Sequence, residues 1–351
     1  MCANIKILRR KTLRNVEIFI CISIFGISLY AFMHIDRELT TYELINQNKT
    51  VNLSCHYIDG DNALPLIDPK FTPAEHSIFF HDTSCRGSLN SRQMCAIESA
   101  ARVHPDRQVY VFFNSAVSEA TLIGKLAILL NMSNVFLARI HIKEYAENTP
   151  VVALIENGTL AKTNWGIENT SNVLRFLTLF KWAGVYLDTD VVVVKSFDSL
   201  SGNWIAKEDG RLLNSAALAL DDYTMGRQVA KDFIEDIVNN YKIDNWAHNG
   251  PGVVTRVLSK YCGTNDLSKM TPAKCQGFTV LEPKYMYPIH YKHRKRYFQP
   301  GNPEDTPEAY IHHVWNRLTH HLKVPKDSLY AKLAKQYCPS VYELYDEEFG
   351  L

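Results

Sequence analysis

Two aspartates separated by one threonine, Asp188 and Asp190, interrupt an apolar run from Val185 to Val194. Side chains of a β-strand alternate between its faces, so one continuous strand would point both carboxylates the same way. Close, buried carboxylates repel each other and require a cation or hydrogen bonds. Such hard oxygen ligands suit Mg²⁺ or Mn²⁺ bound with a substrate's phosphates. The pattern predicts a divalent metal site; the alternative is an Asp-Thr-Asp turn between two short strands.

The segment before these aspartates, residues 172–182, predicts a helix with one buried face, because its apolar residues recur at helical spacing. These residues are Val173, Phe176, Leu177 and Phe180. Ser171 is a candidate N-cap and Gly184 a candidate C-cap. Asn172 and Arg175 lie one helical turn apart and can reach one pocket. Since arginine and a metal ion share the charge of a diphosphate well, we predict that Arg175 faces a diphosphate; the alternative is a surface ion pair.

Strand-like and helix-like segments alternate from residue 77 onward, which predicts an α/β fold with a parallel sheet covered on both faces. The expected strands are 78–80, 109–113, 135–142 and 212–220, and the expected helices are 94–103, 121–130, 172–182, 229–241 and 253–260. Ligands of such folds bind beyond the carboxyl ends of the strands. No glycine-rich dinucleotide motif or Walker loop occurs in the sequence. His81-Asp82-Thr83-Ser84, after the first expected strand, is a candidate site for a nucleotide base.

Two later segments combine polar residues with tight turns or charge. Residues 245–252 contain Trp246, His248 and Asn249 among glycines and a proline. Such turns often build sugar sites, because aromatic faces stack on sugar rings while amides bond hydroxyls. We therefore predict His248 and Asn249 in a sugar pocket, with a core position as the alternative for Trp246. The cationic run Lys292–Arg296 is either a solvated loop or a segment that approaches a diphosphate or anionic lipid.

The amino-terminal segment predicts a membrane anchor, because five cations precede an uncharged apolar run, Ile18–Met33. Lys and Arg flanking a span stay on the cytoplasmic side. The run is short for ~30 Å of hydrocarbon, which suits a thinner, early secretory membrane. We predict a cytoplasmic tail at 1–17, a transmembrane signal anchor at 18–35, a stem at 36–76 and a lumenal catalytic domain at 77–351. A cleaved signal peptide is the alternative.

Cysteines and glycosylation sequons also favour an oxidising, lumenal compartment. Sequons begin at Asn48, Asn52, Asn131, Asn157 and Asn169. Beyond the expected anchor an even number of cysteines remains: Cys55, Cys85, Cys95, Cys262, Cys275 and Cys338. The sequence contains no Cys-x-x-Cys motif, so we do not expect a zinc site. The formal net charge of +1 gives no support to nucleic-acid binding.

Several separated sequence blocks carry a family resemblance. They are Ser171-Asn172-x-Leu174-Arg175, Gly184-Val-Tyr186-Leu-Asp188-Thr-Asp190, His248-Asn249-Gly250-Pro251-Gly252, Thr255-Arg256-Val257, Tyr287-Pro288-Ile289 and His313-Val314-Trp315-Asn316. In this order, from about residue 77 to 342, they resemble the DxD glycosyltransferases related to the lactosylceramide 4-α-galactosyltransferases, or globotriaosylceramide synthases. The first two blocks also occur in yeast-type α-mannosyltransferases and bacterial glucosylating toxins. The family usually has Asp where this chain has Asn172.

The resemblance implies roles for particular residues. It implies a GT-A-like, single Rossmann-like domain with a mostly parallel central sheet. It implies Asp188, Asp190 and Arg175 as catalytic residues, Asn172, Arg175, Tyr186, Asp188 and Trp315 as donor-binding residues, and His313 as a third metal ligand beside Asp188 and Asp190. Asn214, Asp221 and Asp222 are candidates for the far side of the reacting carbon, and His248 and Asn249 for the sugar pocket. With spacing, it suggests the disulfides Cys85–Cys95 and Cys262–Cys275.

The implied function is a retaining, metal-dependent hexosyltransferase of the Golgi membrane, with its catalytic domain in the lumen. We expect Mn²⁺ or Mg²⁺ as the metal, UDP-Gal or UDP-GalNAc as donor, and the terminal Gal or GalNAc of a glycosphingolipid as acceptor of an α-1,4 linkage. Three alternatives remain open at this stage. They are another DxD glycosyltransferase such as an α-mannosyltransferase, an aspartyl-phosphate phosphatase, and a silent lumenal protein that binds sugar nucleotides. The sequence does not indicate an oligomeric state.

Overall fold

The computed structural model of the chain describes residues 53–351 except 59, 69 and 164, and leaves out the side chain of residue 246. The expected tail at 1–17, the anchor at 18–35 and the first part of the stem lie outside the described residues. No helix within the described part of the chain is long and apolar enough to cross a membrane.

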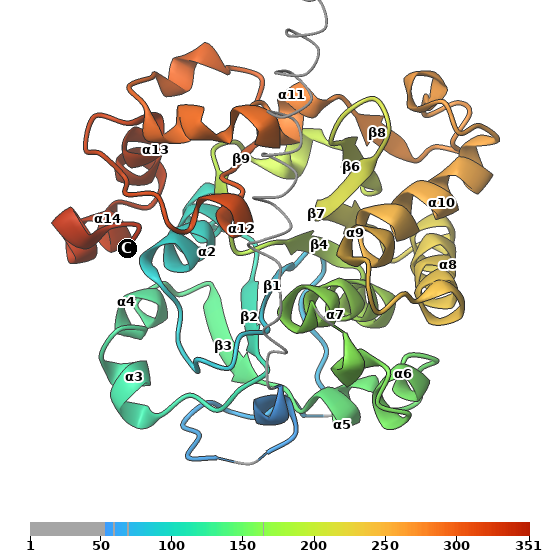
Figure 1. Ribbon diagram of the computed structural model, residues 1–351, viewed down its shortest axis with the longest axis horizontal. Coiled ribbons are helices and arrows are strands. Elements are labelled where there is room, and N and C mark those ends of the chain that lie inside the picture. The colour runs from blue at the N-terminus through green and yellow to red at the C-terminus, as the bar shows by residue number, and fades with distance from the viewer. Residues whose placement is uncertain (1–52, 59, 69, 164) are drawn as a thin grey trace, which may run out of the picture. The chain divides into compact units, whose positions relative to one another are not determined.

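A seven-stranded sheet with the order β3-β2-β1-β4-β7-β6-β8 forms the centre of the molecule (Figure 1). Its strands are β1 Ile78–Asp82, β2 Val109–Phe113, β3 Val135–Arg139, β4 Gly184–Leu187, β6 Trp204–Lys207, β7 Leu213–Leu220 and β8 Thr279–Leu281. All run in one direction except β7, which is antiparallel to both β4 and β6. The predicted α/β fold with a mostly parallel sheet is confirmed, although β7 departs from the parallel arrangement.

Helices connect most of these strands. They are α2 Ser91–Val103, α3 Glu119–Ile123, α4 Ala127–Leu130, α5 Ile142–Ala146, α6 Val152–Glu156, α7 Gly166–Trp182, α8 Thr224–Asn240, α9 Trp246–Asn249, α10 Pro251–Cys262, α11 Pro283–Met286, α12 Asn316–Thr319, α13 Leu329–Tyr337 and α14 Pro339–Tyr345. The predicted N-cap Ser171 is wrong, because α7 begins five residues earlier, at Gly166. The predicted helix 121–130 is divided into α3 and α4, and β3 ends at Arg139, before the predicted limit of 142.

The sheet separates two hydrophobic cores. Helices α2, α13 and α14 gather on one side, and α7, α8 and α10 on the other (Figure 1). The alternation of β1 shows this division, because Ile78 and Phe80 enter the first core whereas Phe79 enters the second. Both faces of the sheet are therefore buried, which explains the continuous apolar runs of β1 and β2.

The continuous strand predicted from Val185 to Val194 does not form. Strand β4 ends at Leu187, residues 188–190 form a turn, and β5 (Val191–Val193) pairs with β9 (Ile311–His313) in a separate two-stranded sheet. The aspartates therefore lie in a turn between short strands, which was the alternative considered from the sequence. Strand alternation does not explain how their side chains are directed.

Gly184 sets the geometry at the start of β4. It has a φ of +93°, and a Cβ at this position would lie 2.6 Å from the backbone oxygen of Ser77. Gly184 was the predicted C-cap of α7, but the observed C-cap is one residue earlier, at Ala183, which has a φ of +56°. Two consecutive residues with positive φ turn the chain directly from helix α7 into the sheet, where a side chain at residue 184 has no room.

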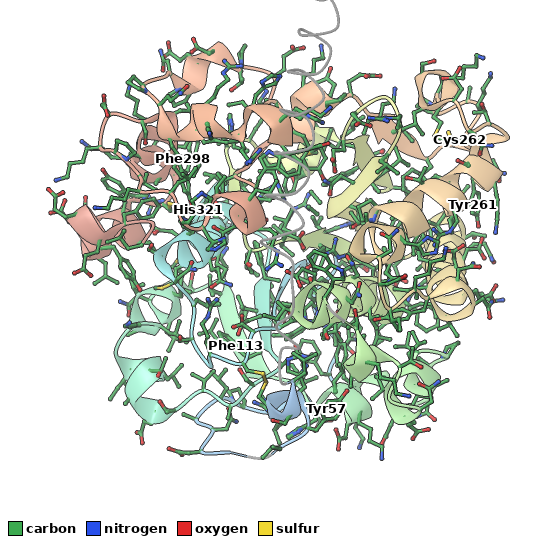
Figure 2. All side chains as sticks on the ribbon, viewed as in Figure 1. Tyr57, Phe113, Tyr261, Cys262, Phe298 and His321 are labelled. Carbon is green, nitrogen blue, oxygen red and sulfur yellow. A yellow bond between two sulfur atoms is a disulfide. The ribbon has the colours of Figure 1, made fainter. Side chains whose placement is uncertain are left out.

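Three disulfides connect the described cysteines: Cys55–Cys85, Cys95–Cys338 and Cys262–Cys275. The Cys262–Cys275 prediction is confirmed; Cys262, labelled in Figure 2, ends α10. The Cys85–Cys95 prediction is wrong. Cys95 lies inside α2 with its side chain fully buried, facing the carboxy-terminal helices and Cys338. Short sequence separation misled the prediction because it ignored which face of α2 packs inward.

The sequons differ in exposure. Asn131 and Asn157 are exposed, whereas Asn169 is fully buried within α7, where its amide donates to Thr163 Oγ1 at 2.6 Å. Asn169 therefore cannot carry a glycan in this folded state.

We predict that loss of Cys95–Cys338 destabilises the fold more than loss of Cys262–Cys275. The bridges close loops with sequence separations of 243 and 13 residues, and chain entropy predicts losses of about 5 and about 3 kcal/mol in the free energy of unfolding. Denaturant unfolding of the Cys95→Ala/Cys338→Ala and Cys262→Ala/Cys275→Ala variants measures both. Equal losses, or a larger one for the short loop, would contradict this ranking.

Candidate active site

Asp188 directly follows β4 and is held by two hydrogen-bond donors. Its Oδ1 accepts from Arg175 Nη2 at 2.9 Å and from the Tyr186 hydroxyl at 2.7 Å. Burial raises the pKa of Asp188, although the Arg175 guanidinium favours the charged carboxylate. Helix α7 and strand β4 thus fix the orientation of one carboxylate.

Asp190 ends the turn and is held by different partners from the carboxy-terminal part of the chain. Its Oδ1 lies 3.1 Å from His313 Nε2, and its Oδ2 accepts from the backbone N–H of Asn316 at 2.8 Å. Burial by itself would raise the pKa of Asp190, but His313 and these hydrogen bonds hold it below its ordinary value. The same carboxylate raises the pKa of His313 against the opposing effect of burial.

Trp315 makes the contact between Asn316 and Asp190 possible. It adopts a left-handed conformation, with φ 56° and ψ 51°, at the start of α12. Its indole N–H donates to the Ile289 oxygen at 2.8 Å, and its ring centroid lies 4.2 Å from that of His313. A bulky residue rarely adopts positive φ, so the surrounding contacts hold a strained turn beside the aspartates.

Asp188, Asp190 and His313 are placed to hold a metal ion. One ligand atom from each lies within 4.8 Å of the other two. Two carboxylates and an imidazole are a suitable set for a divalent cation such as Mn²⁺. The buried Nδ1 of His313 has no hydrogen-bond partner among the described residues. The residues fit the predicted metal site, and His313 is brought to the position expected for a third ligand.

Arg175 is buried, so the surface ion-pair alternative is wrong. Its guanidinium lies over the ring of Tyr186, 4.9 Å from the centroid, and its Nη1 donates to the backbone oxygen of Ser215 at 2.7 Å. With the bond to Asp188, these contacts orient a metal-binding carboxylate. Direct contact between Arg175 and a diphosphate stays a prediction.

Asn172 lies one turn before Arg175 on α7 and is likewise buried. A Cβ at Gly250 would lie only 2.3 Å from Asn172 Oδ1 and 3.0 Å from Ser215 Oγ. Gly250 therefore allows the α9–α10 junction to pack closely against the two elements that hold Arg175. Contact of Asn172 with the donor stays a prediction.

The direction of β7 decides which candidates for the far side of the reacting carbon are near Asp188. Because β7 is antiparallel to β4, Leu187 pairs with Ala217 and Gly184 with Leu220. Asn214, near the start of β7, is therefore on the same edge as the metal-binding residues. Asp221 and Asp222 follow the other end of β7, so the structure does not bring them to the metal-binding residues as predicted. Asp221 instead accepts from the amide of Asn203 at 2.6 Å and from the backbone N–H of Gly226.

His248 and Asn249 are bound to elements outside the metal site. His248 Nε2 lies 2.9 Å from the backbone oxygen of Asn240. Asn249 is fully buried, and its amide donates to Asn169 Oδ1 at 3.0 Å and to the Lys242 oxygen at 2.7 Å. These bonds connect α7, α8 and α9, so Asn249 acts as a structural residue. No described contact joins either residue to the aspartates.

Asp82 ends β1 on the edge of the sheet where Asp188 follows β4. Its side chain is 1% exposed, and its Oδ1 accepts from the Ser84 hydroxyl at 2.8 Å. Burial raises the pKa of Asp82 to about 6. This position agrees with the predicted nucleotide-base site, although no described contact tests that assignment.

The prediction from sequence missed Glu208, which follows β6 on this same edge and accepts from the Asn214 amide at 2.6 Å. The usable signal was its place directly after a short apolar strand, Trp204–Ala206. Glu208 was missed because the segment Lys207–Arg211 has the composition of an exposed turn.

Comparison with known proteins adds independent information. The family described as "Glycosyltransferase sugar-binding region containing DXD motif" matches residues 90–209, and "Alpha 1,4-glycosyltransferase conserved region" matches residues 223–345. Lactosylceramide 4-alpha-galactosyltransferase of Mus musculus is 32% identical over 278 residues, which are 77% of this chain and 76% of that protein. Alpha-1,4-N-acetylglucosaminyltransferase of Homo sapiens is 25% identical over 276 residues, 76% of this chain and 79% of that protein.

Among solved structures, the galactosyltransferase LgtC in complex with donor and acceptor sugar analogues aligns with a TM-score of 0.41 and 14% identity. The alignment covers 74% of this chain and 96% of that one. A TM-score below 0.5 does not show that two proteins share a fold, so the GT-A-like assignment stays a prediction from the resemblance.

We predict that Arg175→Met lowers the free energy of unfolding by about 3 kcal/mol, because it removes a buried cation and leaves the partly buried Asp188 without its partner. The control is Lys231→Met, since Lys231 and Glu235 are both exposed and lie 3.6 Å apart; the free energy of unfolding of this variant should fall by about 1 kcal/mol or less. Urea unfolding measures both variants. Similar losses would show that the Arg175 ion pair does not stabilise the site.

We also predict that burial of Asp82 makes stability fall as pH rises from about 4 to 6. Its folded pKa of about 6 exceeds the ordinary 3.8, so the folded state binds more protons in this window. The expected contribution is roughly 2–3 kcal/mol, and Asp82→Asn should remove it. Unfolding free energies at pH 4 and pH 7 test this, and an identical pH dependence in both proteins would contradict it.

Proposed function

The chain belongs to the DxD glycosyltransferase family that contains the lactosylceramide 4-alpha-galactosyltransferases, and from this premise we propose its reaction. The protein transfers galactose or N-acetylgalactosamine from a UDP-sugar, in α-1,4 linkage and with retention of configuration, to the terminal Gal or GalNAc of a glycosphingolipid. The observation that supports this proposal most is the convergence of Asp188, Asp190 and His313 on one point.

These three residues would hold Mn²⁺ or Mg²⁺. When bound, the metal supplies Lewis-acid stabilisation of the negative charge that develops on the departing UDP. Arg175 and Tyr186 keep Asp188 in one orientation, and the Asn316 N–H does the same for Asp190. Because these donors are fixed before substrate binds, little reorganisation is needed during the reaction.

The acceptor and donor assignments rest on the relatives. The curated relatives include a lactosylceramide galactosyltransferase and an N-acetylglucosaminyltransferase, both described as α-1,4 enzymes. This chain is more similar to the first, at 32% compared with 25% identity, which supports a galactose-type donor and a glycolipid acceptor. Galactose and N-acetylgalactosamine differ only in the substituent at C2, a hydroxyl or an acetamido group, so pocket residues other than the metal ligands select the donor.

The proposed location is the Golgi membrane, with a single amino-terminal anchor and a lumenal catalytic domain. The cations before the apolar run Ile18–Met33 support this orientation. The three disulfides of the described part support an oxidising lumen. A lumenal domain near the membrane would meet the sugar headgroups of its glycolipid acceptors.

We predict that Asp190→Asn lowers kcat/KM for transfer from UDP-Gal or UDP-GalNAc to a neutral glycolipid by about 100-fold or more, because the carboxylate that helps hold the metal is lost. EDTA should abolish transfer by the wild-type protein, and Mn²⁺ should restore it. The control Asp222→Asn changes an exposed carboxylate at the other edge of the sheet and should leave transfer within twofold. Undiminished transfer by Asp190→Asn would refute the assignment.

A further inference from the structure

Glu208 is a partly buried carboxylate in the turn between β6 and β7. Its backbone N–H donates to the Leu212 oxygen at 2.9 Å, which closes the turn. Its Oε2 accepts from Asn214 Nδ2 at 2.6 Å. Asn214 thus holds the carboxylate from the side, and the backbone fixes the position from which it projects.

A short series of hydrogen bonds connects Glu208 to the metal-binding turn. Asn214 Oδ1 accepts from the Ala216 N–H at 2.8 Å, and the Ala216 oxygen accepts from the Asp188 N–H at 2.7 Å. Strands β4 and β6 run in the same direction on either side of β7, so Asp188 and Glu208 both project beyond their carboxyl ends. This is the edge where α/β sheets bind ligands.

Electrostatic effects on two neighbours agree with this placement. After burial, the charges of Asp188 and Glu208 are the main causes that raise the pKa of Tyr287, whose ring centroid lies 5.7 Å from that of His313. Glu208 also contributes to the raised pKa of His313. Both effects place the Glu208 carboxylate within electrostatic range of the metal-binding residues.

Glu208 is not itself part of the metal-binding group, because among the described residues only Asp188, Asp190 and His313 bring ligand atoms within 4.8 Å of one another at this place. No Lys or Arg of the described part of the chain pairs with it, and its Oε1 accepts no hydrogen bond from a described residue. A partly buried carboxylate with one uncommitted oxygen retains strong capacity to accept hydrogen bonds.

We propose that Glu208 binds the sugar ring of the donor by accepting hydrogen bonds from its hydroxyl groups. This inference rests on the proposed function and extends it to a residue that contacts the sugar part of the donor and not the nucleotide part. In the proposed function, a metal bound by Asp188, Asp190 and His313 would hold the diphosphate, and the sugar attached to that diphosphate would be the nearest substrate group with several hydroxyl donors. Asn214 positions the carboxylate and is a positioning residue.

The test compares binding of UDP with binding of UDP-Gal and UDP-GalNAc to the detergent-solubilised full-length protein in the presence of Mn²⁺, by calorimetry. For Glu208→Gln we expect UDP affinity to stay within threefold, while affinity for the preferred UDP-sugar falls by about tenfold or more, the effect of losing a hydrogen bond to a charged group. An equal fall for UDP and UDP-sugar, or no fall for either, would overturn the inference. This measurement requires no turnover.

The matched control is Glu282→Gln, which removes a carboxylate that follows the parallel strand β8 and already pairs with Lys207 at 2.6 Å. Its UDP-sugar affinity should remain unchanged. If wild-type protein binds UDP-sugars but transfers none to any glycolipid, the proposed function fails while the Glu208 comparison still decides this inference. If wild-type protein binds UDP-sugars no better than UDP, Glu208 has no sugar to bind and the inference fails.

A purely structural role for Glu208 predicts a different result with deoxy donors. If Glu208 contacts a hydroxyl directly, wild-type protein should bind the UDP-sugar analogue that lacks this hydroxyl more weakly than the complete UDP-sugar. Glu208→Gln should bind the analogue and the complete UDP-sugar with nearly equal affinity. Such non-additivity identifies direct contact. Additive losses with every deoxy analogue, together with a lowered melting temperature, would assign Glu208 to holding the turn and overturn the proposal.

Discussion

Repulsion between two neighbouring, partly buried carboxylates, Asp188 and Asp190, is the constraint on which the rest of the site depends. The structure gives each carboxylate its own partners: Arg175 and Tyr186 for Asp188, and His313 with the Asn316 N–H for Asp190. These partners come from α7, β4, β9 and the start of α12. The fold thus brings distant segments together around one pair of like charges, and a divalent cation would bind between the two carboxylates.

The single antiparallel strand of the main sheet determines which polar residues reach this place. Since β7 reverses direction between β4 and β6, its first residues, not its last, lie beside Asp188. Asn214 then connects the metal-binding turn to Glu208, while Asp221 caps the opposite end of the strand. One change of strand direction therefore places an amide at the site and removes the more acidic pair Asp221-Asp222 from it.

The sequence was sufficient for the alternation of strands and helices, for most helix positions and for the three residues that converge at the candidate metal site. Apolar spacing identified the inward face of α7, and the order of separated blocks brought in His313, 123 residues beyond Asp190 in the numbering. Local spacing failed where the answer depended on packing between distant segments. Cys95 pairs with Cys338 because α2 faces the carboxy-terminal helices, and no local pattern indicates that contact.

Strand direction and turn geometry were also inaccessible from local sequence. The run Val185–Val194 is as apolar as one strand, yet it turns at the aspartates because β5 pairs with β9 in another sheet. Glu208 lies in a polar turn whose composition matches a solvated loop, and only the register of β6 with β7 shows that its carboxylate is held at the site.

The most direct test of the account is the position of the metal. Anomalous diffraction from crystals of the protein grown with Mn²⁺ and UDP would locate it. We expect one anomalous peak within ligand distance of Asp188, Asp190 and His313, next to the diphosphate. UDP bound at the carboxyl edge of the sheet with no peak at these residues, or with Mn²⁺ held elsewhere, would contradict it.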